Sequence, residues 1–127
     1  MNPDEDATAE VARLKDRMLK RVFYVMRRRI VAPEKLSAAM LDHYRWIIAL
    51  EKQGMVFASG PVSDSDGKPG VGMTVFRAEG FEEAARLAAG DPFCLCGAAE
   101  FDIVSWQVNE GRISLSADFS DQSLTLI

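Results

Sequence analysis

The sequence predicts an α+β fold, and two observations lead to this prediction. Four short runs rich in β-branched and aromatic residues alternate with two segments of helical periodicity, residues 33–54 and 80–90. Between residues 20 and 110 these segments follow the order β-α-β-β-α-β. This order is that of the ferredoxin-like arrangement, in which an antiparallel four-stranded sheet carries both helices on one face.

Length and composition indicate one ordinary globular domain, with 127 residues of which 48% are hydrophobic and 27% charged. The net charge of −4 disfavours nucleic acid and anionic membranes as main partners. No apolar run approaches the roughly 18 residues of a membrane span, and the acidic start MNPDED does not resemble a signal peptide. Cys94 and Cys96 are too close in sequence to clamp the fold, so we expect a reduced, cytoplasmic setting.

The first elements are an extra helix and a strand. Residues 4–19 have helical spacing, with Asp4 or Asp6 as the cap, so residues 1–19 are expected to be a helical extension. Residues 20–31 are the first strand, with apolar side chains on both faces: Val22, Tyr24 and Met26 on one, Phe23 and Val25 on the other. For the arginines at 27–29 we favour a solvated strand end, and the alternative is a basic mouth for an anionic ligand.

The central helix is expected to run from Pro33 to Gly54, because proline fits a first helical position and glycine a helix stop. Its apolar stripe contains Leu36, Met40, Ile47 and Leu50, with the only histidine, His43, at its centre. An imidazole on the face that packs against the protein needs a partner or a chemical role.

The remaining elements complete the predicted domain. Residues 55–58 and 71–77 form a hairpin, closed by a turn at Ser59-Gly60-Pro61 and a loop at 63–70. The helix at 80–90 leads into a compact turn at 91–97 and a strand at 99–109. In the tail, 111–127, the end SLTLI is a candidate added strand.

The strands are apolar on both faces, whereas the helices cover only one. We therefore expect the second sheet face to be covered by the same face of another copy, which gives an isologous homodimer. The tail or the N-terminal helix is the alternative cover.

Several residues in order resemble the YCII-related family. They are His43 in a helix, then Gly54, Ser59-Gly60-Pro61, Gly72, the segment FEEAARLAAGDPF, Gly97, and Trp106 in the last strand. The resemblance covers residues 20–110, while the segments 1–19 and 111–127 depart from the family pattern. It implies a dimeric α/β barrel of ferredoxin-like protomers, with His43 and Asp91 as an acid–base dyad. Some relatives are dehydrochlorinase-type lyases acting on chlorinated hydroquinones, and the wider superfamily includes isomerases and monooxygenases of aromatic or lactone substrates.

Each candidate residue also has a structural interpretation. His43 fits a general acid–base, since its charge changes near neutrality, or a core histidine bonded to a backbone carbonyl. Asp91, which precedes Pro92, fits a helix N-cap as well as a carboxylate that orients an imidazole, and both roles are compatible. Ser59 is a turn serine or a contact for a substrate oxygen.

The other candidates concern binding and cofactors. With Ser59, the neighbouring Gly60 and Pro61 are expected to contact substrate, and Phe93 and Trp106 form either its aromatic wall or part of the core. Two thiols and one histidine are too few for a typical zinc site, and GxGxxG, P-loop, HExxH and GxSxG motifs are missing. No metal or cofactor is therefore expected.

Three functions remain open. The first is a small cofactor-independent enzyme in which His43, oriented by Asp91, performs elimination or isomerisation on a small cyclic or aromatic substrate. The second is a non-catalytic ligand-binding module, and the third is a structural dimer. The enzyme interpretation predicts hydrogen-bond contact between His43 and Asp91, and a pocket that touches both of them and Ser59, with an aromatic neighbour.

Overall fold

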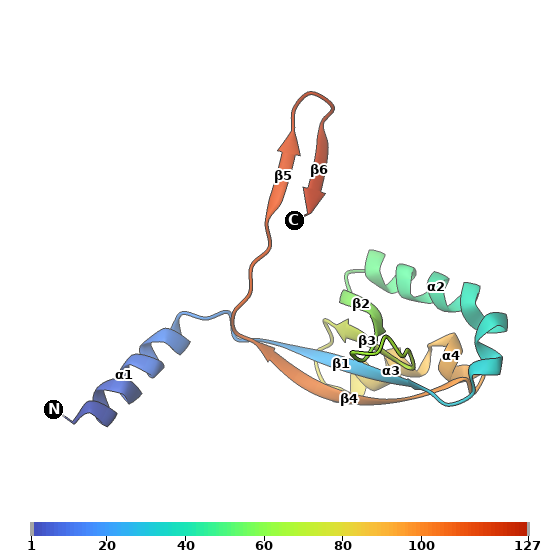
Figure 1. The fold of residues 1–127 in the computed structure, drawn as a ribbon, viewed down its shortest axis with the longest axis horizontal. Helices are drawn as coiled ribbons and strands as arrows, with labels where there is room; N and C mark the ends of the chain where they lie inside the picture. Colours follow the sequence, from blue (N-terminus) through green and yellow to red (C-terminus); the bar gives the residue numbers. More distant parts are fainter. Residues whose placement is uncertain (1, 127) are drawn as a thin grey trace. The chain divides into compact units, whose positions relative to one another are not determined.

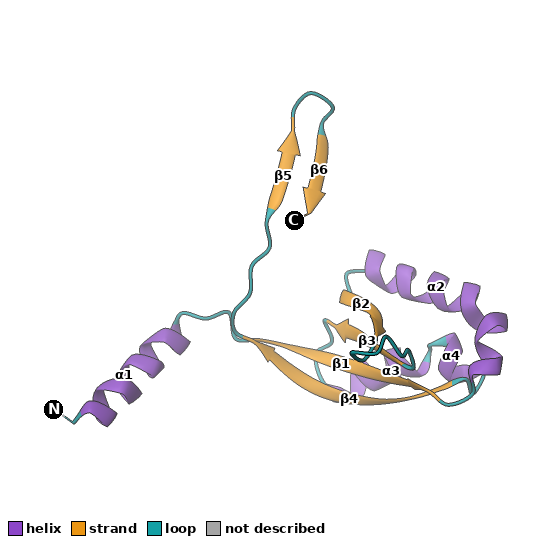
Figure 2. Ribbon diagram, viewed as in Figure 1, coloured by secondary structure: helices purple, strands orange, loops and turns teal. Residues whose placement is uncertain are grey.

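The computed structural model describes residues 2–126, which form two compact units (Figure 1, Figure 2). One unit is the continuous segment Val22–Gln107. The other combines the N-terminal segment up to Arg21 with the segment from Val108 onward. The two units are described separately.

The central unit is built on a four-stranded sheet in the order β2-β3-β1-β4. Its strands are β1 (Arg21–Ile30), β2 (Val56–Val62), β3 (Val71–Phe76) and β4 (Ala99–Val108). β3 is antiparallel to both β1 and β2. The side-chain pairs Arg27–Asp102 and Arg29–Glu100 show that β1 and β4, the longest strands in Figure 1, also run in opposite directions. This order confirms the predicted ferredoxin-like topology.

The helices lie on one face of this sheet, as predicted. They are the 3₁₀ turn η1 (Pro33–Lys35), α2 (Leu36–Lys52), α3 (Phe81–Ala89) and the short α4 (Pro92–Leu95). A single buried cluster joins Met26 of β1, Phe76 of β3, Leu50 of α2, and Ala84 and Ala88 of α3. Because alanine is small, α3 packs closely on the sheet.

The central helix differs from its prediction in two respects. Its first turn, Pro33–Lys35, is a 3₁₀ helix, and the α-helix begins at Leu36 and is followed by Gly54 at φ +79°. The stripe expected to be buried also divides: Leu50 and His43 are buried, whereas Met40 is 38% exposed and lines a cavity.

The predicted turn at Ser59-Gly60-Pro61 is wrong, because these residues belong to β2. Proline interrupts strands by removing a ladder donor, but β2 is an edge strand, where one side of the backbone needs no partner. The chain turns later, between Val62 and Val71.

The sheet face opposite the helices is called the outer face; its aromatic and aliphatic members are Phe23, Val25, Phe57, Val75 and Trp106. Phe23 contacts Phe57 and Trp106, with ring centroids 5.1 and 6.4 Å away. Val25 pairs with Val75 across β1 and β3. Phe57 and Trp106 remain 41% and 44% exposed.

The second unit contains α1 (Pro3–Asp16) and a hairpin of β5 (Leu115–Asp118) and β6 (Ser123–Leu126). Asn2 caps α1 by accepting from the Asp4 backbone N–H, so the predicted caps Asp4 and Asp6 are wrong and lie within the first turn of the helix. The expected strand in the tail is present as β6. Within residues 2–126, no helix has both the length and the apolar character needed to cross a membrane.

Candidate active site

Asp91 is the centre of the candidate site. It follows the end of α3 and caps α4, where Pro92 takes the first helical position, and its side chain is 0% exposed. Oδ1 accepts hydrogen bonds from the Phe93 backbone N–H at 2.9 Å and from His43 Nδ1 at 2.7 Å. Oδ2 accepts from Arg28 Nε at 2.5 Å. One carboxylate therefore joins α2, α4 and β1.

The charges around Asp91 keep it ionised. Burial alone raises the pKa of its carboxyl, but the hydrogen bond from His43, the positive charge of Arg28 and the Phe93 N–H together lower the pKa below its ordinary value. An ionised carboxylate only accepts hydrogen bonds, so the proton between the two side chains belongs to His43 Nδ1.

This lowered pKa predicts an acid-dependent stability. Because the folded-state pKa of Asp91 lies below that of the unfolded chain, near about 4, its contribution is present above about pH 4 and is lost as the pH falls through the folded-state value. Urea unfolding should show the stability difference between the native protein and Asp91→Asn shrinking on acidification from about pH 6 to about pH 2. A difference independent of pH would contradict this.

His43 is held in one orientation. It lies on α2 with 9% of its surface exposed, and its ring stacks on Phe93 with centroids 4.0 Å apart and planes 12° apart. Nε2 has no hydrogen-bond partner among the described residues. Every fully buried side-chain nitrogen or oxygen of these residues has a hydrogen-bond partner. Nε2 has none, so it is not fully buried, and we infer that it opens into the cavity that His43 lines.

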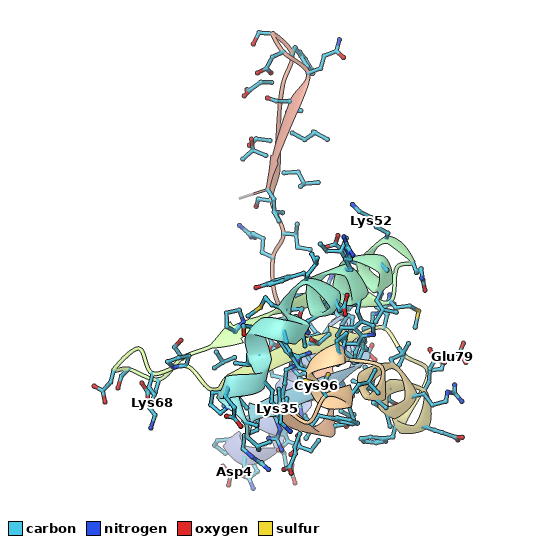
Figure 3. The ribbon with its side chains drawn as sticks, turned by 90° about the vertical axis from the view of Figure 1, so that its right-hand side faces the viewer. Asp4, Lys35, Lys52, Lys68, Glu79 and Cys96 are labelled. Atoms are coloured by element: carbon cyan, nitrogen blue, oxygen red, sulfur yellow. The ribbon has the colours of Figure 1, made fainter. Side chains whose placement is uncertain are left out.

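This cavity has a volume of about 420 Å³ and lies between α2 and the β2–β3 hairpin. Figure 3 labels Lys35 and Lys52 at the two ends of α2, and Lys68 on the loop that joins β2 to β3. Aliphatic side chains form much of its wall, including Leu36, Met40, Ile47, Ile48 and Val71. Its size and apolar wall are typical of a small-molecule site.

Most of the predicted binding residues line this cavity: Ser59, Gly60, Pro61 and Phe93, together with the aromatic Tyr44. Asp91 is not among the lining residues, because it is fully buried behind His43. Trp106 was wrongly expected in the wall. Successive residues of a strand point to opposite faces, and Trp106 lies on the outer face against Phe23.

Arg28 is the residue that the sequence analysis missed. Arg27 and Arg29 pair with Asp102 and Glu100 on the surface, as a solvated strand end should. Arg28 is 5% exposed, bonds Asp91 and lines the cavity. Strand alternation could have identified it, because residues 24, 26 and 28 lie on the same face of β1, the face that packs against the helices.

The two cysteines are free thiols near this region. Cys94 is partly buried, and burial is the main reason that its pKa rises to about 11. Cys96 is exposed. In residues 2–126 no three histidine, cysteine or acidic side chains gather in a group suited to a metal ion.

The arrangement is suited to proton transfer. A carboxylate fixes the tautomer of an imidazole, and the other imidazole nitrogen opens into an apolar cavity. A carboxylate in this position keeps the ring in one tautomer and balances the charge of the imidazolium that forms when Nε2 takes a proton.

Comparison with known proteins gives three findings. The family profile described as "YCII-related domain" matches residues 9–107. The "Uncharacterized protein YjpA" of Bacillus subtilis (strain 168) is 31% identical over 68 residues, which are 54% of this chain and 75% of that protein. Among solved structures, 5-chloro-2-hydroxyhydroquinone dehydrochlorinase (TftG) from Burkholderia phenoliruptrix AC1100, in complex with 2,5-dihydroxybenzoquinone, is 18% identical with a TM-score of 0.49. That likeness covers 65% of this chain and 92% of the other.

Proposed function

The chain belongs to the YCII-related family, and we propose that it is a small enzyme that moves a proton on a small organic substrate by His43/Asp91 acid–base chemistry. The outcome is elimination or isomerisation, and the substrate is cyclic or aromatic. The observation that carries this proposal is the His43 ring, bonded to Asp91 through Nδ1 at 2.7 Å and open to the cavity at Nε2.

In this proposal His43 Nε2 takes a proton from substrate carbon or oxygen and returns it at a second atom. Asp91 stays ionised throughout, because its pKa lies below its ordinary value, and it balances the imidazolium charge. Phe93 keeps the imidazole plane fixed by stacking. No step requires a metal or an organic cofactor.

The cavity wall supports a substrate that is mostly apolar. We assign substrate contacts to Ser59, Gly60 and Pro61 of β2, which face α2 across the cavity, and to the Phe93 ring. The Ser59 hydroxyl lies 2.8 Å from Thr74 Oγ1, so it is already oriented by the sheet. A hydroxyl in this position selects an oxygen-bearing substrate over a hydrocarbon.

The proposal is tested by proton exchange in D₂O. The protein is incubated with a panel of cyclic ketones, unsaturated lactones and chlorinated hydroquinones, and NMR follows the loss of C–H signals and the appearance of products. Catalysed exchange or product formation supports the proposal. Binding of a panel member without exchange would instead favour a non-catalytic ligand-binding module, and no effect on any compound would oppose both.

We further propose that two copies pair through their outer faces. Phe57 and Trp106 are half-exposed there beside the buried Phe23, Val25 and Val75. When this face packs against the same face of a second copy, the apolar side chains of both are buried and the result is a closed, two-fold symmetric dimer.

This pairing predicts that Trp106→Glu weakens dimerisation at least about tenfold, because an aromatic residue at the centre of an interface typically contributes 1–2 kcal/mol or more. Sedimentation equilibrium measures the change. Phe81→Glu is the matched control, since Phe81 is 54% exposed but lies on α3. A native protein that is monomeric at micromolar concentration would refute the pairing.

A further inference from the structure

Arg28 has more hydrogen-bonding capacity than the fold uses. Its Nε donates to Asp91 Oδ2, and its Nη2 lies 3.1 Å from Thr74 Oγ1 and 3.4 Å from Met26 Sδ. These contacts hold the guanidinium plane in one position, and the residue is only 5% exposed. Nη1 has no partner among the described residues.

The unused Nη1 opens into the cavity. Within residues 2–126, every fully buried side-chain nitrogen or oxygen has a hydrogen-bond partner. Nη1 has none, so part of its surface is accessible to solvent. Gly72 is directly across from Arg28 in the β1–β3 register, and a Cβ placed on Gly72 would lie 2.8 Å from Nη1. Both residues line the cavity. The missing side chain at Gly72 is therefore what leaves this N–H group open.

We propose that Arg28 Nη1 binds the hydroxyl or carbonyl oxygen of the substrate and holds the oxyanion that forms on it, while His43 Nε2 is the base that removes the proton. This inference rests on the proposed function and narrows its substrate to phenols, enols and enolisable ketones. Nη1 donates to the substrate oxygen, and Nε2 takes the proton.

The charges support this substrate class over a permanently charged anion such as phosphate. Asp91 neutralises Arg28, so the empty site with a neutral imidazole carries no net charge. A neutral phenol or ketone enters without a charge penalty. When its proton moves to His43, an imidazolium and an oxyanion form together and the net charge stays zero. Glu51, the carboxylate that lines the far end of the cavity, disfavours a dianion there.

The chemical step balances without a further reactant. With a ketone, the C–H bond breaks, its proton goes to Nε2, and the electron pair forms C=C while the carbonyl becomes an enolate held by Nη1. Reprotonation at another carbon gives the isomer, and loss of a β-substituent as an anion gives the elimination product. A fixed donor at the developing oxyanion is the arrangement that lowers such barriers.

The test uses 4-nitrophenol, whose phenolate absorbs visible light, and measures equilibrium binding without turnover. The native protein is expected to bind the phenolate in preference to the phenol, so that bound dye ionises at lower pH than free dye. Gly72→Ala is expected to weaken phenolate binding about ten- to hundredfold, the effect of losing a hydrogen bond to a charged group. Its Cβ would lie 2.8 Å from Nη1, so it fills the space beside that group and displaces the end of the guanidinium from the cavity.

Three variants make the result interpretable. Gly111→Ala adds the same methyl group in open space, at a residue that does not line the cavity, and should retain phenolate binding. Arg28→Lys keeps the positive charge beside Asp91 but has no Nη1, so it provides a second measurement if Gly72→Ala fails to fold. His43→Gln separates the proton acceptor from the oxyanion donor.

The outcomes distinguish the two proposals. If His43→Gln still binds phenolate and Gly72→Ala does not, the Arg28 site stands even where no compound undergoes catalysed exchange. If the native protein binds phenol and phenolate equally, or if Gly72→Ala and Gly111→Ala bind phenolate equally well, the Arg28 site is refuted whether or not His43 is catalytic.

Discussion

Asp91→Asn is expected to lower the free energy of unfolding by about 3–5 kcal/mol, the typical cost of removing one partner of a buried ion pair. The loss is large because Arg28 remains, 5% exposed and without a countercharge, while the amide of asparagine has only one oxygen to accept from both His43 and Arg28. Asparagine has nearly the same shape, so the effect reports the charge and its hydrogen bonds rather than a cavity.

Urea unfolding at neutral pH measures this change, with Asp102→Asn as the matched control. Asp102 pairs with Arg27 on the surface, where both side chains are about half exposed, so its replacement should have little effect. In the double variant Arg28→Met/Asp91→Asn no charge is left uncompensated, and the loss should be smaller than the sum of the two single losses. Additive losses would show that the pair is not coupled.

His43→Gln is expected to reduce kcat/KM by about 10²- to 10⁴-fold on any substrate found, the usual contribution of a positioned acid–base group. Glutamine can still donate a hydrogen bond to Asp91, so the buried carboxylate keeps a partner and the fold is retained. The residual activity should also lose its sensitivity to solvent deuterium in the proton-transfer step, because glutamine cannot take a proton from the substrate.

Steady-state kinetics and circular dichroism check this prediction together. Met40→Leu, an apolar change in the same cavity wall, is the control for a nonspecific effect on binding. A His43→Gln protein that is folded and retains the native rate would remove His43 from the chemistry and leave it as a core residue.

The sequence pattern alone was sufficient for the ferredoxin-like arrangement, and together with the family resemblance it predicted the contact between His43 and Asp91. Helical spacing placed His43 on the face toward the sheet, and the order Gly90-Asp91-Pro92 predicted a helix cap there. Only part of the hydrogen bonding around Asp91 is local, since the N-cap bond to Phe93 spans two residues. The bond to His43 spans 48 residues and required the family resemblance to be anticipated.

The buried position of Arg28 and the continuation of β2 beyond residue 58 were not predicted, for opposite reasons. Three consecutive arginines are most simply explained as a solvated charge run, and strand alternation was not applied to the middle one. At Ser59-Gly60-Pro61 local breaker signals were given more weight than position in the sheet. Whether proline is tolerated depends on the strand lying at an edge, which is settled only when the whole sheet assembles.

The three bonds of Asp91 also govern how this protein can diverge. A mutation there removes the α4 cap, the countercharge of Arg28 and the anchor of His43 at once, so it is eliminated as a folding defect before any new chemistry is tried. Met40, Ile48 and Val71 contribute only apolar, half-exposed surface to the cavity, so they are free to change in small steps. New substrate preferences should therefore arise by mutation of the wall, with the proton-transfer machinery inherited unchanged.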